Sequence, residues 1–166
     1  MISIRPAREA DLEEMRSIYN EAVEKTNATF DIEERTEQGM ILWFRDKGET
    51  YPVIIAETEG RVAGWASLSK WSEKKAYDTT AEVSVYVRER FRKRGIGKRL
   101  IEIITLEGGS SGFHSLLARI TQGNEISMHL FESYGYVHFG TMKEAGKKFG
   151  KFWDVHFLQR IFPENG

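Results

Sequence analysis

The sequence predicts an α+β domain in which a mixed sheet of about seven strands is flanked by about four helices. Apolar runs separated by glycine-containing turns predict antiparallel hairpins. A strand–helix–strand stretch from residue 80 to 121 requires a parallel crossover. A doubly wound parallel fold would lack the hairpins. Because no repeat or linker interrupts the 166 residues, we expect one domain over residues 1–166.

Strands are expected where β-branched and aromatic residues gather, and the run EVSVYV is the strongest of these segments. Gly60 is expected to turn the first hairpin, and the stretch GKKFGK the last. The seven expected strands cover residues 2–5, 52–59, 62–70, 79–87, 114–122, 137–144 and 152–161.

Helices are expected where apolar residues recur at 3.6-residue spacing. Acidic side chains in the first turn favour a helix that begins at Glu9, and Gly135 is expected to cap the last helix. The four expected helices cover residues 9–23, 36–46, 98–107 and 125–136.

Composition excludes several classes of function. The net charge of −1 provides no overall field to attract nucleic acid or an anionic membrane. No cysteine is present, so disulfides and thiolate chemistry are excluded, and the four histidines lack metal-ligand spacing. The chain starts without the apolar run of a signal peptide and has no membrane-spanning stretch. We therefore expect a cytoplasmic protein that binds no metal, nucleic acid or membrane.

The stretch FRKRGIG, residues 91–97, follows the strongest strand and precedes a helix. Free N–H groups at a helix N-terminus suit a phosphate, and Gly95 and Gly97 let it approach the backbone. Cationic side chains at 92–94, 98 and 99 would add charge-assisted contacts. A glycine turn with a solvated basic face explains the same residues. Neither a Walker A loop nor the three-glycine dinucleotide fingerprint is present.

Several stretches together carry a family resemblance. The run RKRGIG resembles the acyl-CoA pyrophosphate motif [Q/R]-x-x-G-x-[G/A] of the GCN5-related N-acetyltransferases (GNAT). Further stretches, from residue 2 to about 162, resemble the branch of that family typified by phosphinothricin and methionine sulfoximine/sulfone acetyltransferases. They are IYNEAV (18–23), ATF (28–30), AEVSVYV (81–87), GFHSL (112–116), GN (123–124), KKFGKFWDV (147–155) and QR (159–160).

The resemblance implies a GNAT-like fold, acetyl-CoA as co-substrate and a homodimer. In the family, main-chain groups of the catalytic strand bind the pantetheine arm and polarise the thioester oxygen, and Asn124 matches a residue on the same side. A role as the N-cap of the following helix would also explain an asparagine at position 124, and both roles can hold. The implied cofactor-binding residues are Val85, Tyr86, Val87, Arg92, Lys93, Arg94, Gly95, Ile96, Gly97, Lys98, Asn124 and Ser133.

The family's acidic strand residue falls on Glu82, which implies a general base that removes the amine proton. Strand alternation places Glu82 on one face with Ser84 and Tyr86. Taken alone, a single strand glutamate is more typical of a solvated surface, and the matching family position favours the base.

Phe131 departs from the family, in which many members carry a tyrosine or histidine that protonates the leaving thiolate. A phenylalanine cannot donate. His129 and Tyr134 are close in sequence but point elsewhere on a helix. A thiolate of ordinary pKa, about 8.5, can leave unaided, so we expect activity to survive.

The implied substrate residues are Phe30, Lys75, Ala76 and Tyr77, together with Glu82. Many relatives have RPAY where this chain has KKAY (74–77), so the rim of the pocket differs. Core packing would explain Phe30 equally well.

The favoured function is transfer of an acetyl group from acetyl-CoA to the α-amine of a small amino acid or analogue, of the phosphinothricin, methionine sulfoximine or methionine sulfone type. One alternative is acetylation of protein or peptide α-amines. Another is an acyl-CoA- or phosphate-binding module without catalysis, which Phe131 keeps open.

Overall fold

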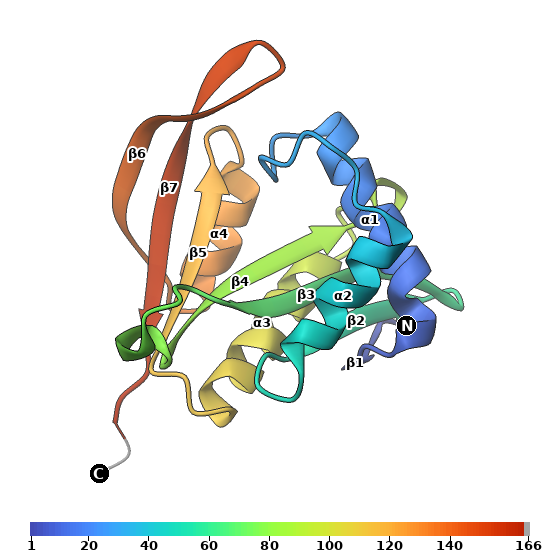
Figure 1. The fold of residues 1–166 in the computed structure, drawn as a ribbon, viewed down its shortest axis with the longest axis horizontal. Coiled ribbons are helices and arrows are strands. Elements are labelled where there is room, and N and C mark those ends of the chain that lie inside the picture. Colours follow the sequence, from blue (N-terminus) through green and yellow to red (C-terminus); the bar gives the residue numbers. More distant parts are fainter. Residues whose placement is uncertain (165–166) are drawn as a thin grey trace.

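The computed structural model describes residues 1–164, and over this range it contains a seven-stranded sheet and four α-helices (Figure 1). None of these helices is long and apolar enough to cross a bilayer. The elements are β1 (Ser3–Pro6), α1 (Leu12–Lys25), α2 (Glu37–Lys47), β2 (Val53–Thr58), β3 (Arg61–Lys70), β4 (Thr80–Val87), α3 (Ile96–Ser110), β5 (Ser115–Thr121), α4 (Glu125–Ser133), β6 (Val137–Lys148) and β7 (Lys151–Ile161). Short 3₁₀ turns are η1 (Glu9–Asp11), η2 (Lys75–Tyr77) and η3 (Glu89–Phe91).

The strands lie in the order β1-β2-β3-β4-β5-β7-β6. Throughout residues 1–164 neighbouring strands are antiparallel, except that β4 and β5 are parallel and joined through α3. This arrangement confirms the predicted α+β class and mixed sheet. The parallel pair stands in the middle of the sheet, which matters for the site described below.

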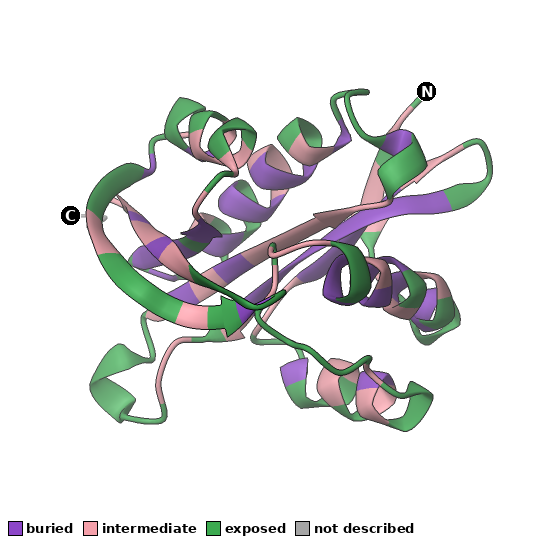
Figure 2. Ribbon diagram, turned by 90° about the horizontal axis from the view of Figure 1, so that it is seen from above, coloured by how far each residue is buried: buried purple, intermediate pink, exposed green. Residues whose placement is uncertain are grey.

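Both faces of the sheet are covered by helices. Residues of α1 and α2 such as Met15 and Met40 pack with Trp65 on one face. Residues of α3 and α4 such as Leu100, Ile104 and Phe131 pack on the other. Figure 2 shows buried residues along the central strands and the sheet-facing sides of the helices. The core therefore packs against β4 on both faces and against β5 on the α3 and α4 face.

Two hairpin turns are formed by residue pairs with positive φ. Glu59 and Gly60 turn β2 into β3, as the sequence predicts, and Phe149 and Gly150 turn β6 into β7. The prediction that the sixth strand ends at residue 144 was wrong, because β6 runs to Lys148. The ladder shifts register between Met142 and Gly146, so polar residues of low strand propensity stay paired beyond the irregularity.

The helix boundaries follow their caps. The helix predicted from residue 98 begins at Ile96, because Gly95 adopts a left-handed conformation with φ of +80° directly before it. The last helix ends at Ser133, and Gly135 follows with φ of +84°. Two N–H groups then return to the helix, from Gly135 to the Glu132 carbonyl (3.1 Å) and from Tyr136 to the Phe131 carbonyl (3.2 Å). This Schellman motif confirms the predicted glycine cap.

Candidate active site

The main cleft begins where β4 and β5 separate. Their parallel pairing covers only Thr80–Glu82 against Ser115–Leu117, although both strands continue further. Figure 1 shows the two strands diverging beyond this point. A cleft of about 1070 Å³ extends from the opening, and Glu82 lies at its apex.

The edge of β4 that faces this opening carries main-chain groups that β5 does not pair. The Arg88 N–H group donates to the Ala63 carbonyl at 2.8 Å. Every second residue of an antiparallel strand is hydrogen-bonded to its partner strand, so the main chain of Tyr86, like that of Arg88, pairs with β3. The main-chain N–H and C=O groups of Val85 and Val87 point the other way, toward the opening. An open strand edge can bind an extended ligand as an added strand. Tyr86 contributes to the cleft through its side chain.

The basic turn after β4 leads into the N-terminus of α3. The Arg99 N–H group donates to the Gly95 carbonyl at 3.1 Å and closes the first helical turn. The N–H groups of Ile96, Gly97 and Lys98 therefore have no partner within the helix. No side chain caps this end, and Gly95, Ile96, Gly97 and Lys98 all line the cleft. Free N–H groups and the positive end of the helix dipole make this helix N-terminus chemically suited to an anion, and phosphate binding here stays a prediction.

The cationic side chains of this turn point to different places. Arg92, Lys93 and Lys98 line the cleft. Arg94 instead forms an ion pair with Glu59 in the β2–β3 turn at 2.9 Å and is not part of the cleft wall. The structure thus brings three of the four predicted phosphate-binding cations of residues 92–98 to the cleft.

Glu82 forms an ion pair with Arg119 on β5, a residue that the sequence analysis did not single out. Nε of Arg119 lies 2.6 Å from Oε2 of Glu82, and Nη2 donates to Oε1 at 2.8 Å. The Glu82 side chain is 15% exposed and that of Arg119 54%. Oε2 is buried, and no donor in residues 1–164 meets it at hydrogen-bond geometry, so the 2.6 Å contact is an ion pair only. One signal was available, because Arg119 is the single charged residue of the strand SLLARIT.

The part of the cleft on the α1 and α2 face is aromatic and polar. Tyr86 packs edge-on against Tyr19, with 5.1 Å between ring centroids, and lies 4.9 Å from Trp65. The Arg35 guanidinium lies 4.1 Å from the Tyr19 ring centroid. The pKa of the Tyr86 hydroxyl is raised, mainly by burial, so this group stays protonated at neutral pH. Ser67 Oγ is buried here without a hydrogen-bond partner in the described chain.

Phe30 reaches the cleft from the segment that follows α1 and packs against the β6–β7 hairpin. A Cβ atom at Gly146 would lie 2.5 Å from the Phe30 ring, so the ring rests on the bare backbone of β6. Lys148 Nζ donates to the Thr29 carbonyl at 2.9 Å and ties the same segment down. The hairpin therefore positions Phe30 on the cleft wall, while its contact with substrate stays a prediction.

Lys47 is a second group near Glu82 that the sequence analysis missed. Its residue is 8% exposed, and Nζ donates to the Leu68 carbonyl at 3.0 Å and to Ser69 Oγ. Ser69 is the direct partner of Glu82 in the β3–β4 ladder. Burial, with a smaller contribution from the Arg35 charge, lowers the pKa of Lys47 to about 8. Sequence periodicity gives no signal for it, because a lysine at the end of a helix usually faces solvent.

The histidine and the two tyrosines nearest Phe131 in the sequence do not line the cleft; they are His129, Tyr134 and Tyr136. Phe131 lines it and packs edge-on against Tyr136 at 5.0 Å. The Tyr136 hydroxyl is hydrogen-bonded to Thr105 Oγ1 at 2.9 Å, and burial raises its pKa to about 12. The His129 side chain is 82% exposed and faces Glu132. Tyr134 lies outside the cleft wall.

The remaining predicted residues divide into two groups. Asn124 lines the cleft and also caps α4, since its Oδ1 accepts from the Ser127 N–H group at 3.3 Å. Ser133 lies outside the cleft wall and donates to the Leu130 carbonyl at 2.7 Å. Lys75, Ala76 and Tyr77 form the exposed turn η2 before β4, which is likewise outside the wall. Roles for these four residues stay predictions.

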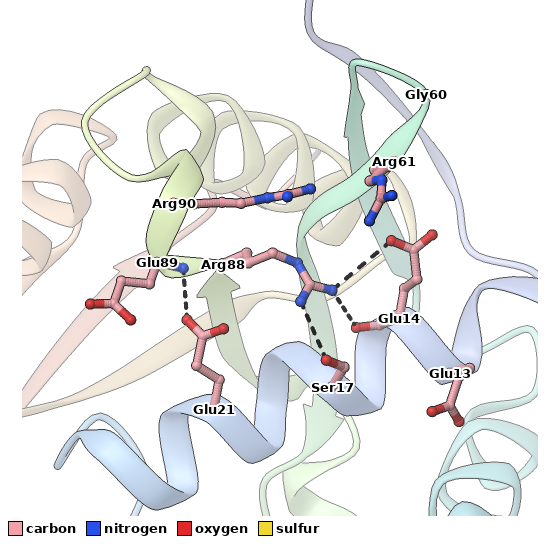
Figure 3. A pocket seen from close by; sticks show the side chains of 9 residues that line it. All are labelled: Glu13, Glu14, Ser17, Glu21, Gly60, Arg61, Arg88, Glu89 and Arg90. Carbon is pink, nitrogen blue, oxygen red and sulfur yellow. Dashed lines mark hydrogen bonds and ion pairs between the residues drawn. The ribbon is translucent and has the colours of Figure 1, made fainter.

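Figure 3 shows a second depression, of about 880 Å³, between α1, the β2–β3 turn and the end of β4. Arg88 donates to Ser17 Oγ (3.3 Å) and to the Glu14 carbonyl (3.4 Å), and the Glu89 N–H group donates to Glu21 Oε1 (2.7 Å). These groups hold α1 to the end of β4, and we assign the depression a structural role. Over residues 1–164, no three His, Cys, Asp or Glu side chains gather as a metal site.

Comparisons with known proteins agree with this fold. Residues 4–157 match the family described as "Acetyltransferase (GNAT) domain". The phosphinothricin N-acetyltransferase of Streptomyces viridochromogenes is 37% identical, over 97% of this chain and 88% of that protein. The L-methionine sulfoximine/L-methionine sulfone acetyltransferase of Pseudomonas aeruginosa is 34% identical, over 95% and 92%.

Among solved structures, the GNAT phosphinothricin acetyltransferase of Sinorhizobium meliloti in complex with acetyl-CoA has a TM-score of 0.93 and 32% identity, covering 96% of this chain and 88% of that one. The chain belongs to the GNAT family of N-acetyltransferases.

Proposed function

We propose that this enzyme acetylates the α-amine of a small amino acid or analogue, of the phosphinothricin, methionine sulfoximine or methionine sulfone type. The position of Glu82 carries the proposal. Glu82 lies at the apex of a cleft that has an open strand edge and a helix N-terminus along one part, and an aromatic and polar wall along another. This arrangement suits a long anionic donor and a compact polar acceptor that meet at one carboxylate.

The residues of the cleft fit acetyl-CoA, which supplies an acetyl thioester. The free N–H groups of Ile96, Gly97 and Lys98 suit its pyrophosphate, with further charge from Arg92 and Lys93. The main chain of Val85 and the N–H group of Val87, which β5 does not pair, would hold the pantetheine arm together with the Asn124 side chain. The Val87 carbonyl itself accepts a hydrogen bond from Arg92 Nε at 3.3 Å, so at Val87 the N–H group is the one offered to the ligand.

Glu82 supplies the proton acceptor that the reaction needs. An amine attacks a carbonyl carbon only as the free base, so its proton must leave, and the Glu82 carboxylate can accept it directly or through water. The new N–C bond forms as the C–S bond breaks, and the pair of electrons leaves with sulfur. A thiol of ordinary pKa, about 8.5, is a fair leaving group without protonation, which agrees with a phenylalanine at position 131.

We further propose a cytoplasmic homodimer. Large apolar side chains are exposed on the β6–β7 hairpin, and β6 is an edge strand of the sheet. Exposed apolar groups gathered on one element favour an interface with another protein surface. They are Val137, Phe139, Met142, Phe149 and Phe152. A chain without cysteine is compatible with a reducing compartment.

A panel of amines tests the proposed substrate class. Release of the CoA thiol would be followed with phosphinothricin, methionine sulfoximine, methionine sulfone, free amino acids and short peptides. We expect turnover with the first three and little with peptides. Preferred turnover of peptides would favour a peptide Nα-acetyltransferase, and tight acetyl-CoA binding without turnover would favour a non-catalytic binding module.

A further inference from the structure

Arg119 occupies a position that the proposed chemistry leaves unexplained. It lies on β5 two residues beyond Leu117, the last residue of β5 paired with β4. Its side chain is 54% exposed on the cleft, whereas that of its partner Glu82 is 15% exposed. The guanidinium therefore stands at the surface of the cleft with the carboxylate behind and beside it.

Only one edge of the guanidinium is used. Nε and Nη2 face Glu82, at 2.6 and 2.8 Å from its two oxygens. Arginine carries five N–H donors, and the two on Nη1 make no hydrogen bond to any residue in the described range 1–164. Cζ of Arg119 lies over the Trp71 ring, 5.7 Å from its centroid, within the range of a cation–π interaction. Arg119 and Glu82 thus present a free donor edge and a carboxylate side by side.

The charges of an α-amino acid complement those of Arg119 and Glu82, because its carboxylate is negative where Arg119 is positive and its amine is basic where Glu82 is a carboxylate. Its amine and its carboxylate are attached to the same carbon atom, so both can face the pair at once. We propose that Arg119 binds the α-carboxylate of the substrate while Glu82 faces its amine. Arginine suits this role because its planar donors match the geometry of a carboxylate. The inference rests on the proposed function and makes Arg119 the residue that distinguishes amino acids from other amines.

Arg35 is the other arginine on this part of the cleft, and it is less suited. Its guanidinium lies over the rings of Tyr19 and Trp43, at 4.1 and 5.2 Å, and one of its N–H groups points at Met40 Sδ. No contact joins it to Glu82 within the described structure. Arg35 therefore serves as the competing candidate in the test.

The test compares methionine sulfone with its α-carboxamide, which keeps the amine and removes the negative charge. R119Q should lower kcat/KM for the acid about 10- to 100-fold more than for the amide, mainly through KM, because one charge-assisted contact is lost. R119K, which keeps the charge without the planar donors, should lose less. R45Q is the matched control, since Arg45 forms an exposed ion pair with Glu9 outside the cleft. Equal losses on both substrates, or a selective loss in R35Q instead of R119Q, would overturn the proposal.

An equilibrium measurement separates this inference from the proposed function. If the wild-type enzyme releases no CoA with any free amino acid, the proposed function fails. Binding of methionine sulfone and of its amide to the CoA-loaded enzyme can still be measured by calorimetry. Tighter binding of the acid that R119Q removes supports the carboxylate site, and equal binding of acid and amide contradicts it.

Discussion

Gly95 and Gly97 differ in what an added side chain would meet, so a substitution at one should affect protein stability and a substitution at the other should affect acetyl-CoA binding. A Cβ at Gly97 would lie 3.8 Å from Leu130 Cδ1 and Val87 Cγ2, which is ordinary contact, and it would project into the cleft. A Cβ at Gly95 would meet nothing within 4 Å, but the residue has φ of +80°. Gly97→Val should therefore impair binding, whereas Gly95→Ala should impair folding.

The magnitudes follow from these geometries. Valine at 97 would separate a phosphate from a helix N–H group, and loss of one hydrogen bond to a charged group costs about 1.5–3 kcal/mol. The Kd for acetyl-CoA should therefore rise roughly 10- to 100-fold. Alanine at 95 must adopt a left-handed conformation, which costs about 1–2 kcal/mol of stability. In a chain of this length, that corresponds to a fall in Tm of about 2–8 °C.

Both variants would be measured in both assays, with acetyl-CoA binding by calorimetry and unfolding by urea and by heat. Gly97→Val should bind more weakly and keep nearly wild-type stability, and Gly95→Ala should show the larger loss of stability and the smaller change in Kd. If Gly97→Val bound acetyl-CoA as well as the wild type, the assignment of the α3 N-terminus to the pyrophosphate would be refuted.

Two further predictions concern buried polar groups. Tyr136→Phe should lower the free energy of unfolding by about 1–3 kcal/mol, because it leaves the Thr105 hydroxyl buried without a partner; the double variant with Thr105→Val should recover most of the loss in urea unfolding, and a merely additive loss would contradict this reading. Lys47 has a pKa of about 8 in the folded protein, against an ordinary value of 10.5. Between pH 8 and pH 10.5 the unfolded chain therefore binds a proton that the folded chain has released, so the free energy of unfolding should rise with pH. Lys47→Met should remove up to roughly 3 kcal/mol of that rise, and an unchanged pH profile of unfolding would argue against a buried lysine at this position.

Much of the fold was predictable because its signals are local. The gathering of β-branched and aromatic residues identified β4, and glycines marked the β2–β3 turn and the end of α4. The extension of β6 was not predictable, because its last residues are polar and are held by long-range contacts, namely pairing with β7 and the contacts of Gly146 and Lys148 with the segment after α1. Propensity describes a segment alone, whereas pairing across an irregular ladder depends on its partner.

The site divides in the same way. Glu82 and the turn around Gly95 were identified through contiguous motifs. The contact between Glu82 and Arg119 joins residues 37 positions apart and exists only because β5 lies beside β4 and then parts from it. The contact of Lys47 with Ser69 likewise joins the end of α2 to β3, 22 positions further along the chain. Long-range contacts of single side chains leave no periodic trace in the sequence.

The most direct test of the central claim is the rate of E82Q. This change keeps the size of the side chain and removes its ability to accept a proton. With methionine sulfone we expect kcat to fall roughly 10²- to 10⁴-fold while the Kd for acetyl-CoA stays near the wild-type value. Glu102, paired with Arg99 at 3.0 Å on α3 and outside the cleft wall, provides the control variant E102Q, which should retain kcat. A near-wild-type kcat in E82Q would remove Glu82 from the mechanism.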